Sequence, residues 1–238
     1  MIESFVLGTF LLNVYAAGLV VARALCYRTK VYRPMLWNIW LSVLPIIILG
    51  VGFVVGSLAM VAQRWLGLLV YAVVAVVWLL MLPNASYLIT ELNLSHRREG
   101  DPVPLWSDII LVISLAMSGV LNTVLNVFLA HLMYATTRYG DAARSLLEPD
   151  AMIFVAVLLL LLGFGMYLGR YLRLNSWDVK HPTQLIAKLA RHFRERENAW
   201  NGFGFTLTYA LFLGIIYIVV AGTVIVGLEL VEVARAAA

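Results

Sequence analysis

Charged side chains are scarce in this sequence. Asp, Glu, Lys and Arg make up 13% of its 238 residues, about half the share of roughly 25% that is usual in soluble domains. Hydrophobic residues make up 63%. Such a chain has too little polar material to cover a surface that faces water, so its solvent must be lipid. The composition therefore excludes a water-soluble globular protein.

Cysteine is almost absent too, since Cys26 is the only one. A single cysteine excludes an internal disulfide and any multi-cysteine metal or iron–sulfur site. The four histidines are scattered, and no HExxH, GxSxG or P-loop motif occurs. We therefore expect no metal site and no cofactor. The net charge is +4, but no basic–aromatic pattern of a nucleic-acid module accompanies it, so nucleic acid is not an expected partner.

Long apolar runs are what the sequence does contain. A helix needs about 20 apolar residues to cross a hydrocarbon core of ~30 Å, and helices are the expected spanning elements because the backbone finds no water there. We predict an all-α, polytopic membrane protein with one transmembrane domain over residues 1–238. Its six predicted spans cover about 5–25, 38–61, 66–82, 108–134, 151–169 and 203–228.

A basic amphipathic helix is predicted over residues 182–198, outside these runs. Apolar side chains recur there at helical spacing, at Leu185, Ile186, Leu189 and Phe193. The basic residues between and beyond them are Lys188, Arg191, Arg194 and Arg196. This pattern is typical of a helix that lies on an anionic leaflet, so the expected partners are membrane lipids and inner-leaflet headgroups. A solvated linker helix is the alternative.

The distribution of charge predicts the orientation. Thirteen of the 17 Lys and Arg residues are assigned to the first, third and fifth loops, with Arg23 near the end of the first run counted among them. Because cytoplasmic loops carry an excess of Lys and Arg, we expect these loops to be cytoplasmic and both termini to lie outside.

The fourth run carries a polar stripe. Four of its polar residues follow one another at four-residue steps, which places them on one helix face. The stripe comprises Ser114, Ser118, Asn122 and Asn126, with His131 beyond them. Polar groups facing lipid are costly, so the stripe must face the bundle. It lines a hydrated pathway or supplies interhelical hydrogen bonds, for which Asn13 in the first run is a possible partner.

Two polar segments, at about 83–108 and 169–178, contain the remaining candidates. Both follow apolar runs and are expected at the same membrane face. Glu91 and Asp108 can hold a cation, share a proton or satisfy a helix N-terminus. Arg170 and Arg173 suit phosphate or carboxylate, or they serve only orientation and headgroup contact. The predicted ligand-binding cluster comprises Asn84, Tyr87, Glu91, Trp106, Asp108, Arg170, Arg173, Asn175, Trp177 and Asp178.

The same segments carry a resemblance to a known family. Pro83-Asn84-Ala85-Ser86-Tyr87, Trp106-Ser107-Asp108 and the segment 168–178 resemble the bacterial membrane-protein family called domain of unknown function 1361. The similarity extends from about residue 40 to 225. Ser86 and Glu91 stand where that family has Pro and Asp. The resemblance implies a multi-pass protein of the bacterial inner membrane and no particular activity.

Three interpretations of function follow from these patterns. In the first, the protein binds or transports an anionic lipid-like molecule or small solute, with the ionic cluster as its site and the polar stripe as its path. In the second, it is an intramembrane enzyme for a lipid-linked substrate, and Glu91, Asp108 or Asp178 is acid, base or metal ligand. In the third, it is a structural or accessory subunit whose charges only hold the fold together.

Overall fold

The chain folds into helices that are long and apolar enough to cross a membrane. The computed structural model describes residues 1–89, 102–172 and 182–237, and every regular element within these ranges is helical. Six stretches have the length and hydropathy of a span, namely Ile2–Cys26, Arg33–Ala62, Arg64–Ile89, Leu105–Tyr139, Pro149–Tyr171 and Arg196–Arg235. This confirms the predicted all-helical, polytopic membrane protein.

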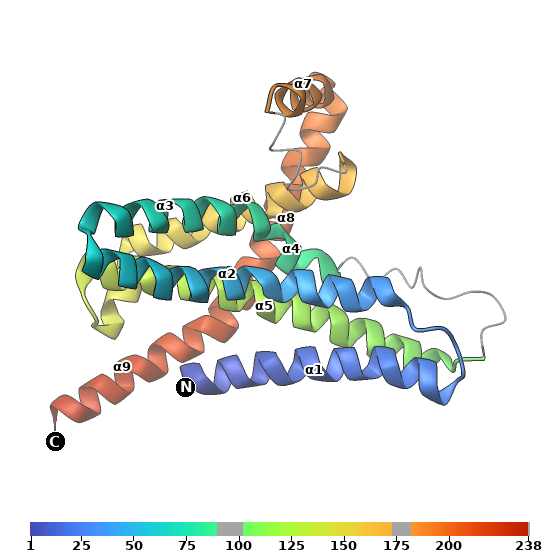
Figure 1. Cartoon of the computed structure of the whole chain (residues 1–238), viewed down its shortest axis with the longest axis horizontal. Coiled ribbons are helices and arrows are strands. Elements are labelled where there is room, and N and C mark those ends of the chain that lie inside the picture. The colour runs from blue at the N-terminus through green and yellow to red at the C-terminus, as the bar shows by residue number, and fades with distance from the viewer. Residues whose placement is uncertain (90–101, 173–181, 238) are drawn as a thin grey trace. The chain divides into compact units, whose positions relative to one another are not determined.

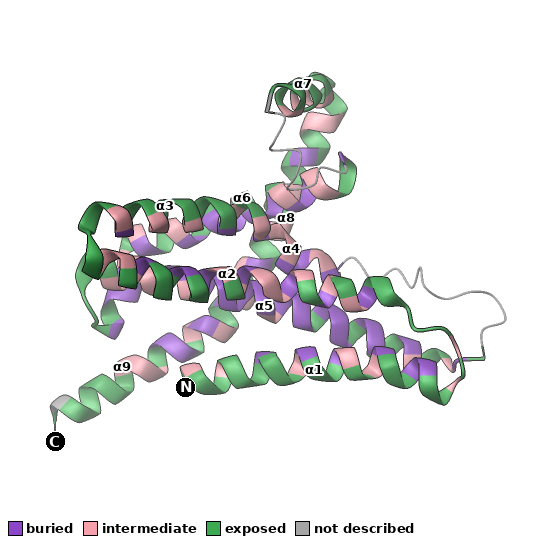
Figure 2. Ribbon diagram, viewed as in Figure 1, coloured by how far each residue is buried: buried purple, intermediate pink, exposed green. Residues whose placement is uncertain are grey.

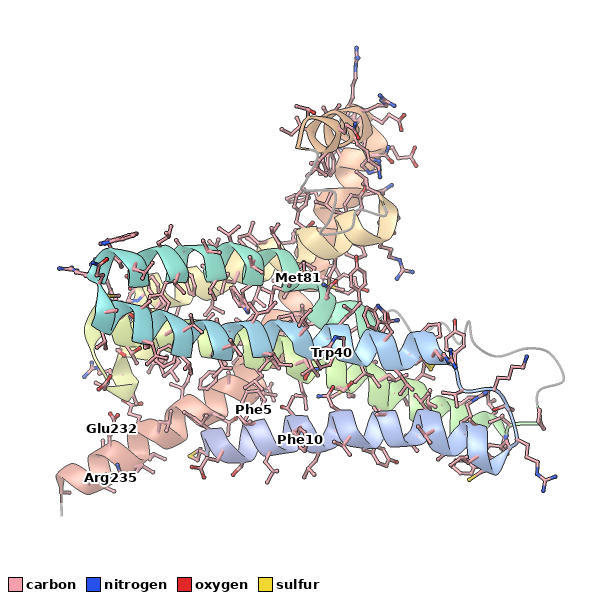
Figure 3. The ribbon with its side chains drawn as sticks, viewed as in Figure 1. Phe5, Phe10, Trp40, Met81, Glu232 and Arg235 are labelled. Atoms are coloured by element: carbon pink, nitrogen blue, oxygen red, sulfur yellow. The ribbon has the colours of Figure 1, made fainter. Side chains whose placement is uncertain are left out.

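Large apolar side chains cover the outside of these helices. Phe10 on the first helix and Trp40 on the second, both labelled in Figure 3, are 61% and 50% exposed. Only 22% of the most apolar window of each of the first two helices is buried, against 72% for the fourth span, and Figure 2 shows the same contrast. An exposed apolar surface of this size marks contact with a membrane or with another protein, and the length and hydropathy of these helices favour the membrane. It follows that these helices face lipid.

The chain divides into two compact units, residues 1–126 and 127–238. The N-terminal unit contains α1 (Ile2–Cys26), α2 (Arg33–Ala62), α3 (Arg64–Met81), α4 (Pro83–Ser86) and the first part of α5 (Leu105–Tyr139). The C-terminal unit contains the rest of α5, η2 (Ala143–Leu147), α6 (Pro149–Tyr171), α7 (Pro182–Phe193), α8 (Arg196–Tyr217), η4 (Ile218–Gly222) and α9 (Thr223–Ala236). These labels are those of Figure 1.

Helices α2 and α3 form a hairpin in which the two backbones lie close together (Figure 1). The close approach depends on two glycines of α2. A Cβ atom on Gly52 would lie 2.3 Å from Val74, and one on Gly56 would lie 2.4 Å from Tyr71. Small residues four apart allow this kind of packing in membranes, so these two glycines permit the close approach of α2 and α3.

Pro83 does not stop the helical path, contrary to the expectation that the third span ends at residue 82. Helix α3 ends at Met81, and the short helix α4 follows with Pro83 at its first turn. Proline is compatible with that position, because the first N–H groups of a helix have no intrahelical acceptor. The third span therefore continues to Ile89.

The core of the N-terminal unit forms where α1, α2 and α5 meet the segment after α4. Its buried members are Ala16, Val20, Met35, Ile39, Leu88, Leu111 and Leu115. All of them are apolar, and their mutual contact sets which face of α5 points inward. That face is also the one on which the polar stripe lies.

In the C-terminal unit, α5 ends at Tyr139, where Gly140 follows with a φ of 89°. Glycine adopts this left-handed conformation without steric cost and often terminates a helix. The chain then passes through η2 into α6, which packs against α8. Glu232 of α9, labelled in Figure 3, accepts a hydrogen bond from the backbone N–H of Ala143 at 3.0 Å, so α9 contacts the start of η2.

The last span is longer than a bilayer requires. The stretch Arg196–Arg235 has 40 residues, and at 1.5 Å per residue it extends about 60 Å, whereas the hydrocarbon core is ~30 Å thick. The stretch is not uniform, because the π-helical segment η4 separates α8 from α9. The helical path is therefore longer at both ends than the predicted 203–228.

A helix lies where the amphipathic helix 182–198 was predicted, but α7 ends at Phe193 and Arg196 already begins α8. Part of the apolar face of α7 packs on its own unit. The ring of Phe193 lies 5.9 Å from those of Phe164 and Tyr167. Leu185 and Leu189 are half-buried, and Ile186 is 64% exposed. Figure 1 shows α7 crossing the start of α8. Only a part of the apolar face is thus free to contact lipid.

We predict that Gly163→Ala lowers the melting temperature of the purified protein. A Cβ atom there would lie 2.7 Å from the backbone oxygen of Thr206 on α8. A backbone atom cannot move aside without shifting its helix, and overpacking of this kind costs about 1–3 kcal/mol. Gly204→Ala is the matched control, because a Cβ on Gly204 would have nothing within 4 Å. Equal melting temperatures for both variants would contradict the close packing of α6 on α8.

Candidate functional site

Asn122 is the centre of the polar stripe on α5. Its side chain exchanges two hydrogen bonds with Asn13 of α1, at 2.8 and 3.0 Å, and donates a third to Ser42 of α2 at 2.8 Å. Asn122 and Ser42 are completely buried. Asn13 is the partner that the sequence suggested. The amide therefore joins three helices through one side chain.

The hydrogen bonds continue from α2 into α4. Ser42 donates to the backbone carbonyl of Ala85 at 2.7 Å. The hydroxyl of Ser86 lies 2.6 Å from that of Thr123 on α5. Both pairs are buried, and a buried hydroxyl needs such a partner because lipid offers none. The short helix α4 is thus fixed to α2 on one side and to α5 on the other.

The other members of the stripe also have partners. Asn126 accepts a hydrogen bond from Trp78 Nε1 at 3.0 Å and donates to the carbonyl of Asn122 at 2.8 Å. Ser114 and Ser118 donate to carbonyls of α5 itself. These bonds support the interpretation of the stripe as interhelical hydrogen bonding. The hydrated pathway stays a prediction.

Asp108 forms a buried ion pair with Arg23. The distance from Arg23 Nε to Asp108 Oδ1 is 2.8 Å, and the side chains are 8% and 0% exposed. Arg23 also donates to Thr29 Oγ1 at 3.3 Å. Sequence analysis had placed Arg23 among the loop charges, whereas it lies within α1 and is buried. Asp108 therefore has a cationic partner that was not among the predicted site residues.

The remaining members of the predicted cluster are placed in different parts of the chain. Asn84 and Tyr87 are half-buried and Trp106 is exposed, all in the N-terminal unit. Arg170 is exposed in the last turn of α6, in the C-terminal unit. Five members lie outside the described residues: Glu91, Arg173, Asn175, Trp177 and Asp178. The convergence of the whole cluster stays a prediction.

A second polar network joins three helices of the C-terminal unit. The hydroxyl of Tyr167 on α6 lies 2.8 Å from Nε2 of His192 on α7 and donates to the carbonyl of Asn198 on α8 at 3.1 Å. Asn198 in turn donates to the carbonyl of His192 at 3.2 Å and to Glu195 at 2.7 Å. The last turns of α6 and α7 therefore lie beside the first turn of α8.

The proton count of this network defines its donors. The Tyr167 hydroxyl has one hydrogen, which goes to the Asn198 carbonyl. With that hydrogen on the Asn198 carbonyl, the tautomer of His192 that fits the contact is the one with a hydrogen on Nε2, which donates to the tyrosine oxygen. None of these three residues was a predicted site residue. The sequence feature that could have indicated the network is a tyrosine within an apolar run, because a buried hydroxyl requires a hydrogen-bond partner.

Carboxylates at the other end of α6 are also bound. Asp150 accepts hydrogen bonds from Tyr139 at 2.6 Å and from Tyr134 at 3.1 Å. It also accepts from the backbone N–H of Ala151. Its position in the first turn of α6 favours a negative charge. Within the described ranges no three His, Cys, Asp or Glu residues come together as a metal site.

These features define a class of protein, an all-helical and multi-pass membrane protein whose spans are joined by buried polar contacts. The chain belongs to the family described as "Protein of unknown function (DUF1361)", whose model matches residues 37–219. No curated protein and no solved structure is significantly similar to it. The match covers α2 to α8 and the π segment up to residue 219, which includes most of both polar networks.

We predict that Arg23→Ala strongly destabilises the protein. Removing one partner of a buried ion pair leaves the other charge uncompensated and costs about 3–5 kcal/mol. The double variant Arg23→Met and Asp108→Leu should recover most of that loss, because apolar residues of similar volume replace both charges. Unfolding in mixed detergent micelles measures both variants. Unchanged stability of Arg23→Ala would show that the pair contributes little.

Proposed function

We propose that this membrane protein binds, and in doing so helps to transport, an anionic lipid-like molecule or small anionic solute. The single observation that supports this best is the group of exposed basic residues where α6 and α7 end and α8 begins. Its described members are Arg170, Lys188, Arg191, Arg194 and Arg196. Glu195 and Glu197 are the exposed acidic residues in the same segments, so the excess charge is positive. Excess positive charge is what an anion site requires.

The network of Tyr167, His192 and Asn198 supports a preorganised site. Its hydrogen bonds fix the end of α6, the end of α7 and the start of α8 to one another. The basic side chains on those ends are then presented from a fixed backbone, and their guanidinium groups suit phosphate or carboxylate oxygens. Arg173, Asn175, Trp177 and Asp178 would complete this site in the proposal.

Exposed aromatic residues beside the charges favour an amphiphile over a simple ion. A shallow depression on α8 is lined by Arg196, Ala199, Trp200 and Phe203, and the two aromatic side chains are 62% and 60% exposed. Tryptophan is enriched at the boundary between headgroups and hydrocarbon. A ligand with a negative headgroup and an apolar chain fits a guanidinium next to such rings.

The proposal places this surface at the cytoplasmic face of a bacterial inner membrane. The count of Lys and Arg in the loops supports that side, because positive loops stay in the cytoplasm. Inner leaflets with anionic lipids would also attract the basic face of α7. In this arrangement α7 lies at the leaflet surface and both termini lie outside.

A structural or accessory role is the second candidate, and the N-terminal unit favours it. Arg23 neutralises Asp108, and the amide of Asn122 is fully engaged by Asn13 and Ser42. Polar groups that satisfy one another in this way hold helices together and leave little capacity for a ligand. The same ion pair weighs against Asp108 as the base of an intramembrane enzyme.

The ligand proposal predicts a lipid-dependent stabilisation that depends on charge. Wild-type protein in zwitterionic detergent should melt at a higher temperature after phosphatidylglycerol or a polyprenyl phosphate is added, because a ligand that binds only the folded state stabilises it. Lys188→Gln with Arg191→Gln should lose at least half of that shift. Arg64→Gln with Arg144→Gln is the matched control, since these exposed residues are expected at the opposite face. Equal shifts in all three proteins would refute the site.

The orientation has a separate test. In a Cys26→Ala background, cysteine at position 144 should react with a membrane-impermeant maleimide in intact cells. Cysteine at position 188 should react only after the membrane is permeabilised. Both positions are exposed, so access to the reagent depends on the side of the membrane. Labelling of position 188 in intact cells would reverse the topology.

A further inference from the structure

Arg28 has a backbone conformation that favours glycine. Its φ is 53°, in the left-handed region that residues other than glycine and asparagine rarely adopt. The residue directly follows Tyr27, the C-cap of α1. The backbone N–H of Thr29 donates to the carbonyl of Ala24 at 3.1 Å, which is the hydrogen bond of a helix end closed by a left-handed residue. An arginine therefore stands at the position of this motif where glycine is usual.

The loop that contains Arg28 is fixed to the buried ion pair. Arg23 donates to Oγ1 of Thr29 at 3.3 Å, and that hydroxyl donates to the carbonyl of Arg23 at 3.4 Å. Arg23 is itself paired with Asp108 of α5. The two neighbours of Thr29, Arg28 and Lys30, are exposed. The loop thus presents two cations from a backbone that is anchored to α1 and α5.

The sequence around this loop contains no acidic residue to balance its charge. Arg28, Lys30 and Arg33 are all exposed, and no Asp or Glu occurs between Glu3 and Glu91. An excess of positive charge can orient the chain in the membrane from any backbone conformation, so orientation does not explain the strained position of Arg28. Residues kept in rarely populated conformations are common at ligand clamps. The side chain of Arg28 is therefore a candidate for binding.

Helix α2 continues the basic loop with two exposed tryptophans. Arg33, Trp37 and Trp40 follow one another at steps of four and three residues, which places them on one helix face. Both indoles are exposed, and Trp40 is labelled in Figure 3. A single face of α2 passes from a guanidinium group to indoles and then to aliphatic side chains. The exposed aliphatic residues beyond Trp40 on this face are Ile47, Val51, Val54 and Leu58.

The length of α2 places these groups at a membrane boundary. From Trp40 to Ala62, where α2 ends, the helix rises about 33 Å, close to the ~30 Å of the hydrocarbon core. Tryptophan is enriched where hydrocarbon meets the headgroups. Arg33 lies about 10 Å before Trp40 along the helix, where a long arginine side chain meets the headgroups.

We propose that Arg28, Lys30 and Arg33, together with Trp37 and Trp40, form a binding site for one phospholipid with an anionic headgroup. The cations bind phosphate oxygens, for which guanidinium and ammonium groups are suited. The indoles cover the glycerol region, and the apolar face of α2 carries an acyl chain. A free anion would gain nothing from that face, so the ligand is the lipid. The site belongs to the N-terminal unit and is independent of the anion surface proposed at the ends of α6 and α7.

Arg28→Gly separates lipid binding from a structural role, because the variant should fold. Glycine adopts the left-handed conformation without steric cost, so the delipidated variant should melt no lower than its parent. All proteins carry Lys188→Gln and Arg191→Gln, which removes the contribution of the anion surface. In zwitterionic detergent, phosphatidylglycerol should raise the melting temperature of the parent, since a ligand of the folded state stabilises it. Arg28→Gly should lose at least half of that rise.

The control is Arg64→Gln in the same parent, because Arg64 is an exposed arginine with a helical backbone beside the exposed Trp65. It should keep the full rise, and native mass spectrometry should find less bound phosphatidylglycerol on Arg28→Gly than on the parent or the control. Equal rises in all three proteins would refute the site, as would an equal rise of the parent with inorganic phosphate or with phosphatidylcholine. A delipidated Arg28→Gly that melts below the parent would also overturn the proposal, because the arginine would then serve the fold. Failure of the anion surface in its own test leaves this result unchanged, because the parent lacks that surface.

Discussion

Hydrocarbon offers no hydrogen bonds, and the polar side chains of α5 can exist inside a membrane only because other helices provide partners for them. Asn122 shows how much follows from this constraint. Its amide is matched by Asn13 on α1 and by Ser42 on α2, and Ser42 in turn reaches the backbone of α4. Apolar contacts between helices distinguish weakly between one helix register and the next, because a leucine that loses its contact with a helix gains an equally apolar contact with a lipid tail. A slip of one helix by a residue would instead break several of these buried bonds, so the polar contacts select the register of the N-terminal unit.

The ion pair of Arg23 and Asp108 connects two of the same helices. Its contribution is mainly to the orientation of α1 and α5, and less to the free energy of unfolding. Burying two charges costs several kcal/mol per ion, and their attraction repays this only with good geometry. The 2.8 Å distance and the additional bond to Thr29 supply that geometry. The pair joins the end of α1 to the first turn of α5, where the helix N-terminus also favours the carboxylate. It is thus best understood as a device that orients two helices.

The fold was largely predictable, and the site only in part, for physical reasons. Apolar runs long enough to cross a membrane indicate directly that a helix is surrounded by lipid, so the spans could be predicted. The helical spacing of apolar residues likewise predicted α7. The polar stripe was found because four-residue spacing places Ser114 and Asn122 on one face. The partners of the polar side chains were harder to predict. Arg23 lies near the end of an apolar run and was counted as a loop charge, and nothing in the sequence shows that its side chain is buried. Likewise, Ser86 looked like a mild departure from the family's proline, whereas its hydroxyl bonds Thr123 across two helices. The third span was predicted to end at residue 82, whereas Pro83 lies in the first turn of α4 and the helical path continues.

Polar groups differ between the two units in how completely they are satisfied within the described ranges. In the N-terminal unit, Asn122 and Asn126 of the polar stripe bond to side chains of other helices, and Ser114 and Ser118 bond to backbone carbonyls of α5. Oγ1 of Thr206, a buried polar side-chain atom that lacks a partner in the described ranges, belongs to the C-terminal unit. That unit also carries the exposed basic ends of α7 and α8, fixed by Tyr167. Satisfied polar groups stabilise a fold, whereas an excess of charge retains binding capacity at a cost in stability. The polar groups of the N-terminal unit therefore hold its helices together, whereas the ends of α7 and α8 keep an excess of exposed positive charge.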